Sequence, residues 1–242
     1  MESTPSILVR FSTSEAVVNY FKKEIEEGHI LLGEKLPSER LLQKQLHISR
    51  FSLREGLARL SALGIIKVVH GKGAFVSSEI DSTSLGNVLL PLLLNPNSDS
   101  YKDIFEVRLL IEERVAVLAA SRRLNKDLEE LQQILERSEI ALSDAINFGE
   151  LDYLFHSRIS KAAGNTIFIK MLDVINKHLR SFLYDHARDA TSRKKALKSH
   201  WKIFESIKKK QTEEAGKITK NHIKDCKRNY ERLILNRGNV QP

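Results

Sequence analysis

Three histidines and one aspartate in the second half of the chain have the types and the spacing of a metal site. Asp152 and His156 are four residues apart in LDYLFHSRIS, so a helix places both on one face, one turn apart. His200 and His222 each interrupt a separate stripe of apolar residues at helical spacing. A lone buried histidine is more often a hydrogen-bonded core residue than a ligand, but three stripes interrupted independently favour a shared site.

The chemistry of these four side chains fits a divalent transition metal. Burial of an unpaired carboxylate costs free energy, and a bound cation removes that cost. Three imidazoles and one carboxylate suit zinc first, with nickel or manganese as alternatives. An open position on such an ion could activate water for hydrolysis. The sequence has no hydrolase signature such as His-Glu-x-x-His, however, so an enzyme is the less favoured hypothesis.

Long helical patterns surround these residues. From Tyr101 onward no segment has the alternation that is typical of a strand, and apolar residues recur at helical spacing. Helices are predicted at 101–122, 125–147, 149–162, 165–188, 191–210 and 213–233. Together they predict an all-α bundle, whose inward-facing positions can converge on an internal site.

The stretch from Leu36 to Val76 has a different organisation. Ser38 and Ser49 are expected to cap two short amphipathic helices. The residues expected to face inward are Leu41, Leu42 and Leu46 in the first helix and Leu53, Leu57 and Leu60 in the second. Two β-rich runs follow, 65–69 and 74–76, and Gly71-Lys72-Gly73 between them is typical of a hairpin turn. This order predicts a winged helix-turn-helix, so the whole chain is expected to be mainly α.

The second of these short helices has the side chains of a DNA-reading helix. Arg50, Ser52 and Arg54 lie in its first turn and a half, on the side opposite the leucines. Arginine can pair with guanine through two hydrogen bonds, and small polar side chains can hold phosphates. Double-stranded DNA is therefore the expected partner.

Length and composition are consistent with two domains. The chain has 242 residues, and the polar segment 77–84, which has no core pattern, predicts a linker. The expected organisation is a DNA-binding domain at 1–77, a linker with a short apolar helix (85–94) at 78–100, and a helical domain at 101–235.

Charge and cysteine content narrow the cellular setting. The net charge of +8 is compatible with nucleic acid but does not prove it. The basic excess is largest at 191–242, where a solvated helix surface is the simpler interpretation. No apolar run is long enough to span a bilayer, and the N-terminus lacks the pattern of a secretory signal. The single cysteine, Cys226, fits a reducing compartment, so a cytoplasmic protein without membrane contact is expected.

The residues from Leu36 to Val76 resemble the GntR family of bacterial transcription regulators, including the family's PSER motif at 37–40. The resemblance implies that Arg40, Arg50 and Arg54 contact DNA and that His70 and Gly71 approach the minor groove. Phe51 departs from the small Thr or Ser often found at its position. The full set of expected DNA-binding residues is Arg40, Ser49, Arg50, Phe51, Ser52, Arg54, His70 and Gly71.

Residues 101–233 resemble the FCD ligand-binding domain of the FadR subgroup, through EVRLLIEERVAVLAA, LDYLFH, AAGN and the two late histidines. The resemblance implies that Asp152, His156, His200 and His222 bind the metal and that Arg108 pairs with an effector carboxylate. Asn165 is expected to line the same cavity. Two alternatives stay open: Arg108 could form a surface salt bridge with Glu112, and Gly164-Asn165 could simply end a helix.

These patterns favour a regulator rather than an enzyme. The expected protein is a homodimer that binds a double-stranded operator and responds to a small carboxylate effector at its metal site. Repression is the commoner case in the family and is expected here. A third hypothesis is a DNA-binding architectural protein whose metal is purely structural.

Overall fold

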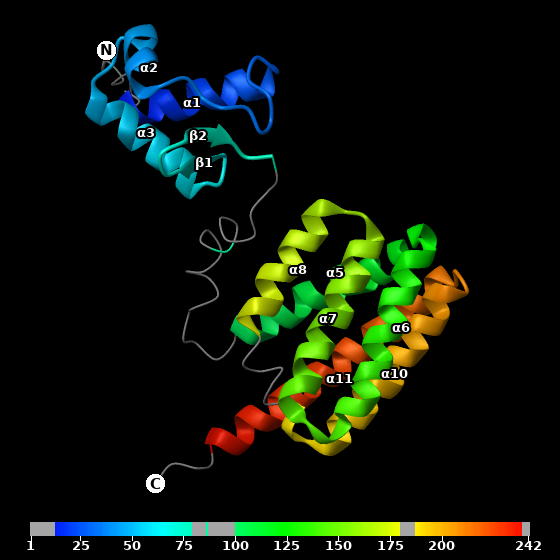
Figure 1. Cartoon of the computed structure of the whole chain (residues 1–242). Helices are drawn as coiled ribbons and strands as arrows, with labels where there is room; N and C mark the ends of the chain where they lie inside the picture. The colour runs from blue at the N-terminus through cyan, green and yellow to red at the C-terminus, as the bar shows by residue number, and fades with distance from the viewer. Residues whose placement is uncertain (1–12, 79–85, 87–99, 180–186, 239–242) are drawn as a thin grey trace, which may run out of the picture. The chain divides into compact units, whose positions relative to one another are not determined.

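The computed structural model describes residues 13–78, 86, 100–179 and 187–238. The chain divides into two compact units, Met1–Val88 and Leu89–Pro242, and each is described by itself. The fold class predicted from sequence is confirmed: a small helical unit with a β-hairpin precedes a unit whose described elements are all helices (Figure 1). The predicted linker helix at 85–94 falls outside the described residues, apart from Gly86.

The N-terminal unit is a three-helix winged head. Its elements are α1 (Thr13–Glu26), α2 (Glu39–Leu46), α3 (Arg50–Ala62), β1 (Ile66–Val69) and β2 (Gly73–Val76). Both predicted caps are present, because the Ser38 hydroxyl accepts the backbone N–H of Leu41 at 3.3 Å and the Ser49 hydroxyl accepts that of Ser52 at 3.0 Å. Capping therefore sets where α2 and α3 begin.

One leucine predicted to face inward is exposed. Leu42 is buried under α2, as expected, but Leu41 is 46% exposed. Neighbouring residues on a helix point about 100° apart, and an eight-residue helix lies on its neighbours along one narrow stripe. Only one of two adjacent leucines can occupy that stripe, so the prediction for Leu41 was wrong.

The wing contains more backbone pairing than the sequence indicated. β1 and β2 are antiparallel, with Ile66 opposite Val76 and Val69 opposite Gly73. The segment before α2 joins them, since the Leu36 N–H donates to the Ala74 carbonyl and the Val76 N–H donates to the Glu34 carbonyl, both at 2.8 Å. The start of α2 is thus tied directly to the wing.

The C-terminal unit is a bundle of long helices. Its described elements are α5 (Ser100–Arg122), α6 (Asn125–Ile140), a 3-10 turn η1 (Ala141–Ser143), α7 (Ala145–Ala163), α8 (Thr166–His178), α10 (Ala190–Lys208) and α11 (Thr212–Gly238). The prediction that the second helix of this unit extends to residue 147 and the third begins at residue 149 is wrong. Asp144 caps α7 by accepting the N–H groups of Ile146 and Asn147 at 3.1 Å each, so the third helix begins four residues earlier.

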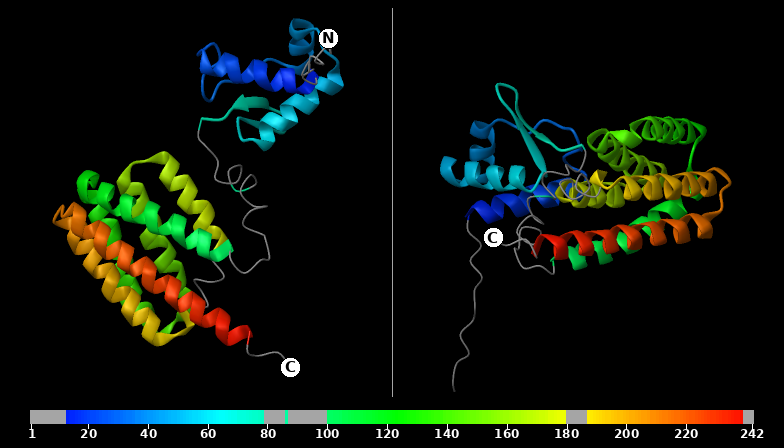
Figure 2. Two further views of the ribbon diagram at one scale, coloured as in Figure 1. Left: turned by 180° about the vertical axis from the view of Figure 1, so that it is seen from behind. Right: turned by 90° about the horizontal axis from the view of Figure 1, so that it is seen from below.

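The long helices of the bundle surround one interior region. α5 packs against α11 and α7, and α10 packs against α11 and α6 (Figures 1 and 2). Aromatic and aliphatic side chains fill the core, among them Phe148, Leu151 and Phe155 of α7 and Phe204 of α10. Among the described residues, no helix is both long and apolar enough to cross a membrane.

Close packing of α1 on α3 depends on the absence of a side chain at Gly56. A Cβ atom there would lie 2.6 Å from two side-chain carbons of Val17 and 3.0 Å from the Ser14 carbonyl oxygen. We expect Gly56→Ala to lower the free energy of unfolding of this unit by about 1–3 kcal/mol, because overpacking forces the helices apart. Thermal unfolding measures the change. Arg59→Ala, an exposed substitution on the same helix, is the control, and equal stability of the two variants would contradict the packing argument.

Candidate metal centre and nucleic-acid interface

The four predicted metal ligands converge inside the C-terminal unit. α7 supplies Asp152 and His156, α10 supplies His200 and α11 supplies His222, and their donor atoms all lie within 4.8 Å of one another. His222 Nε2 is 3.2 Å from His156 Nε2 and 3.2 Å from His200 Nε2. Asp152 Oδ1 is 3.4 Å from His200 Nε2. The histidines are buried, so the site lies within the core.

The separations between the imidazole nitrogens fit a shared cation. Two nitrogens that bind one tetrahedral metal at about 2.1 Å are about 3.4 Å apart. His156 Nδ1 lies 2.7 Å from Glu112 Oε2, so this nitrogen carries the proton and Nε2 presents a lone pair in the neutral ring. His222 Nε2 faces two other ring nitrogens and has at most one proton to donate. A metal ion would satisfy all three nitrogens at once.

Glu112 is the residue of the site that the sequence argument missed. Its carboxylate accepts from His156 Nδ1 through one oxygen and from Arg108 Nε, at 2.7 Å, through the other. A carboxylate that binds the second nitrogen of a ligating histidine fixes the ring's tautomer and orientation. The predicted pairing of Arg108 with Glu112 exists, but in the core rather than on the surface, since their side chains are 2% and 4% exposed. The spacing of four residues between Arg108 and Glu112 was the sequence signal that could have predicted this buried pair.

These contacts shift the pKa values of Glu112 and His156. Burial by itself would raise the pKa of Glu112, but the charges and hydrogen bonds of Arg108 and His156 outweigh it and lower that pKa to about 2. Burial by itself would lower the pKa of His156, but the charge and hydrogen bond of Glu112 outweigh it, so this pKa is raised. Removing Arg108 or Glu112 would leave the other charge buried without its main partner.

Arg108 and Asn165, the two residues expected to contact an effector, have different surroundings. Arg108 is 2% exposed, and its Nη1 atom is buried without a hydrogen-bond partner. The side-chain oxygen of Asn165 accepts the Phe168 N–H at 3.1 Å and so caps α8, while Gly164 ends α7. The helix-ending interpretation of Gly164-Asn165 therefore describes the local structure, and a role of Asn165 in ligand binding stays a prediction.

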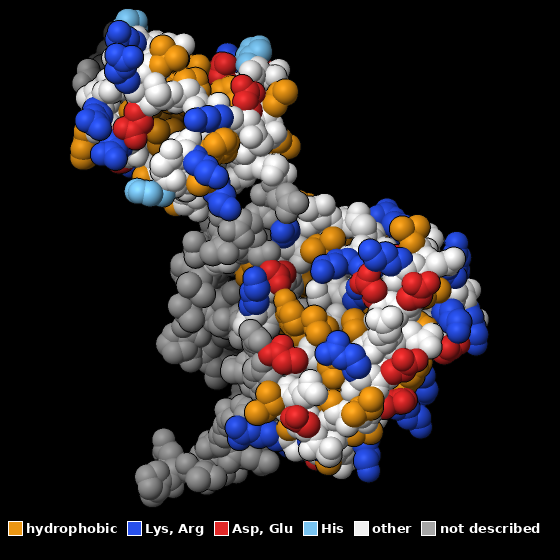
Figure 3. All heavy atoms as spheres, viewed as in Figure 1, with side chains coloured by type: hydrophobic (Ala, Val, Ile, Leu, Met, Phe, Trp, Pro, Cys, Tyr) orange, Lys and Arg blue, Asp and Glu red, His pale blue; other side chains and the backbone are white. Residues whose placement is uncertain are grey.

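The first turns of α3 present the expected DNA-reading side chains. Arg50 and Arg54 are exposed, and each lies near Glu39 of α2, with N–O distances of 3.8 and 3.4 Å. Such exposed ion pairs are weak, so both guanidiniums can exchange Glu39 for another acceptor. Phe51, which lies between the two arginines in sequence, is 78% exposed, and Arg40 and His70 are also exposed. Figure 3 shows Lys and Arg side chains on the visible face of this unit.

Comparison with known proteins assigns both units. Residues 13–76 match the family described as bacterial regulatory proteins, gntR family, and residues 103–225 match the FCD domain. The chain belongs to the GntR family. It is a DNA-binding transcription regulator with an FCD domain, of the FadR-like subgroup, and not an enzyme.

Relatives of this GntR regulator cover most of its length. It is 33% identical over 180 residues to the putative L-lactate dehydrogenase operon regulatory protein of Escherichia coli (71% of this chain, 69% of the relative). It is 28% identical over 192 residues to the HTH-type transcriptional regulator LutR of Bacillus subtilis (76% and 85%). A solved structure, Streptococcus agalactiae GntR, superposes with a TM-score of 0.68 at 28% identity and covers 89% of this chain and 99% of that one.

The exposed arginines of α3 generate a prediction about DNA. Arg50→Ala or Arg54→Ala should weaken binding to a selected operator by roughly 1–3 kcal/mol if each arginine reads a base through two hydrogen bonds. Lys23→Ala, which removes one charge from an exposed position on α1, is the control and should have a smaller effect. Fluorescence anisotropy at fixed salt measures all three, and wild-type affinity in both arginine variants would contradict the assignment of α3 as the reading helix.

The buried carboxylate of Glu112 generates a prediction about metal affinity. Glu112→Gln should weaken zinc binding by about 10- to 100-fold, because the partner of a ligating histidine orients the ring and strengthens its lone pair. Glu113→Gln is the matched control, since Glu113 is the next residue and pairs with Lys220 at 2.8 Å near the surface. Competition with a chelator gives both affinities. Equal affinities would show that Glu112 does not act through His156.

Proposed function

We propose that this GntR regulator binds its operator as a homodimer and represses transcription until a small carboxylate binds beside a metal in the FCD domain. One observation carries the proposal: four metal-type ligands converge next to a buried arginine whose Nη1 atom has no hydrogen-bond partner. Symmetric half-sites are the usual operator for a dimeric winged head. The homodimer and the cytoplasmic location are predictions from sequence.

The metal would be held by Asp152 and the Nε2 atoms of the three histidines. A divalent transition metal supplies a Lewis acid that binds oxygen donors, and zinc, nickel or manganese suits a set of three imidazoles and one carboxylate. Four protein ligands leave one or two positions if the ion is five- or six-coordinate. An oxygen ligand of the effector could occupy them.

The surroundings of the site favour an anionic effector. A divalent ion and Arg108 bring three positive charges, while Asp152 and Glu112 bring two negative ones, so one carboxylate would complete the balance. The planar guanidinium of Arg108 keeps Glu112 on Nε and has Nη1 left for a carboxylate oxygen. The name of one relative refers to an L-lactate dehydrogenase operon, and lactate is a small hydroxy acid of the expected kind.

Ligand binding would join four helices that start far apart in sequence. The ligands lie on α7, α10 and α11, and Arg108 lies on α5, which begins at Ser100, directly after the segment that leads from the DNA-binding unit. A ligand that binds two arrangements of these helices with different affinity shifts their equilibrium. A relative is named the Glc operon transcriptional activator, so the direction of the response needs its own measurement.

The response to an effector should require both the metal and Arg108. We expect a carboxylate found by thermal-shift screening to weaken operator binding, and we expect chelation of the metal to abolish that effect, with recovery when zinc is returned. Arg108→Lys keeps the buried charge but loses the planar fork of separate donor nitrogens, so it should reduce the response and leave basal DNA binding intact. Alanine is avoided, because it would strand Glu112 in the core. Arg114→Lys, at an exposed position on the same helix, is the control.

Two other outcomes would change the proposal. A full response in metal-free protein would reject the coordination mechanism while leaving the family assignment intact. A lower melting temperature on chelation, without any effect of carboxylates on operator binding, would indicate a purely structural metal.

A further inference from the structure

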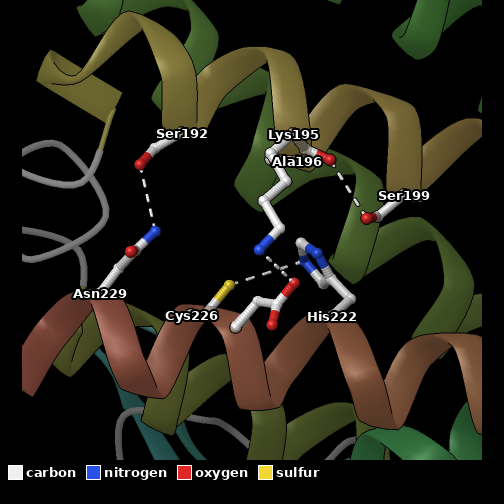
Figure 4. Close-up of a pocket in the computed structure, with 8 residues that line it drawn as sticks. Ser192, Lys195, Ala196, Ser199, His222, Cys226 and Asn229 are labelled. Atoms are coloured by element: carbon white, nitrogen blue, oxygen red, sulfur yellow. Dashed lines mark hydrogen bonds and ion pairs between the residues drawn. The ribbon is translucent and has the colours of Figure 1, made fainter.

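The only cysteine of the chain lies beside the metal ligands. Cys226 follows His222 by one turn of α11, and its side chain is buried. Its Sγ atom is 3.8 Å from His222 Nε2, the nitrogen that also contacts the Nε2 atoms of His156 and His200. Figure 4 shows the sulfur pointing toward the His222 ring. The thiol therefore contacts one of the three imidazoles that converge on the proposed metal position.

The sulfur–nitrogen distance is close to that of two ligands on one ion. Zinc binds sulfur at about 2.3 Å and nitrogen at about 2.1 Å, so two such ligands of a five-coordinate ion lie about 3.1 Å apart at 90° and about 3.8 Å apart at 120°. The 3.8 Å separation in the protein falls at the upper end of this range. In the absence of a metal, the contact can be a weak hydrogen bond between the thiol and the ring nitrogen.

A small pocket of about 10 Å³, room for roughly one water molecule, lies next to this part of the site. It lies between α10 and α11, and His222 and Cys226 are among its lining residues (Figure 4). Lys195 and Asp225 also line it and form an ion pair at 2.8 Å. The thiol thus lies between His222 and a small pocket with polar lining residues.

Charge balance favours a thiolate when no effector is present. The metal and Arg108 leave one positive charge uncompensated by Asp152 and Glu112, and this charge lies in the core. A Cys226 thiolate would supply the missing negative charge, and a metal deprotonates a coordinating thiol. We infer that Cys226 is a further ligand of the metal, bound while the effector position is empty, and that it biases the site toward zinc, cobalt and nickel over manganese.

The inference rests on the proposed metal site and adds a residue to it. The step is a proton-for-metal exchange: the S–H bond of Cys226 breaks, a metal–sulfur bond forms and the proton leaves to solvent, with no change of oxidation state. Sulfur is a softer donor than nitrogen or oxygen, so its loss should matter most for metals that accept soft ligands.

Cobalt titration of the full-length protein in a carboxylate-free buffer tests the inference. Cobalt bound by nitrogen and oxygen alone shows visible ligand-field bands, and a bound thiolate adds a charge-transfer band in the near ultraviolet. We expect both in the wild-type protein. Because the chain has one cysteine, the charge-transfer band can be assigned to Cys226 without a variant.

Variants then separate ligation from packing. Cys226→Ser and Cys226→Ala should lose the charge-transfer band, keep the ligand-field bands, and bind zinc at least about 10-fold more weakly. Their manganese affinity should change less. Ser199→Ala is the matched control, since Ser199 lines the same cavity and donates its hydroxyl proton to the Lys195 carbonyl at 3.1 Å.

The outcomes separate this inference from the proposed function. Ligand-field bands without a charge-transfer band in the wild-type protein would overturn the role of Cys226 and leave the four-ligand site intact. Absence of any cobalt spectrum would overturn both. An equal loss of zinc and manganese affinity in Cys226→Ser would show that the sulfur does not set metal preference.

Discussion

The hydrogen-bonded chain from Arg108 through Glu112 to His156 joins α5 to α7 inside the core of the FCD domain. A charged side chain in a protein interior loses its hydration, and only a partner with good geometry offsets that loss. Arg108 and Glu112 are such partners for each other, and Glu112 in turn orients the His156 ring. His156 Nε2 then faces His222 of α11, so charge pairing determines how three helices meet.

The proposed metal ligands lie within the apolar core of the bundle. The imidazoles stand among aromatic residues, and Phe155 stacks on the His200 ring with centroids 4.4 Å apart. Apolar side chains surround the ligands, and the Nε2 atoms of His156, His200 and His222 face one another. A cation at their centre would remove the repulsion between facing nitrogen lone pairs, so metal binding and helix packing should stabilise the same state.

In the DNA-binding unit, the reading side chains are held more loosely. Glu39 lies near both Arg50 and Arg54, and all three side chains remain accessible to solvent. Rigidity comes instead from the backbone, through the serine caps of α2 and α3 and the pairing of residues 34–36 with the wing. A rigid backbone with weak arginine–Glu39 ion pairs suits a DNA-binding surface, because Arg50 and Arg54 must leave Glu39 when they bind phosphates and bases.

Local patterns in the sequence were sufficient for the helices, the wing, the winged-head fold class and the candidate ligands. Cap residues and apolar spacing act within a few residues, which is why Ser38, Ser49 and the buried leucines of α3 could be predicted, while the cap at Asp144 was overlooked and misplaced one boundary. Only the tertiary structure decided that Leu41 is exposed, that residues 34–36 join the hairpin, and that Glu112 and Cys226 lie beside the histidines. Those relations join segments far apart in the chain, and the packing of α5, α7, α10 and α11 creates them.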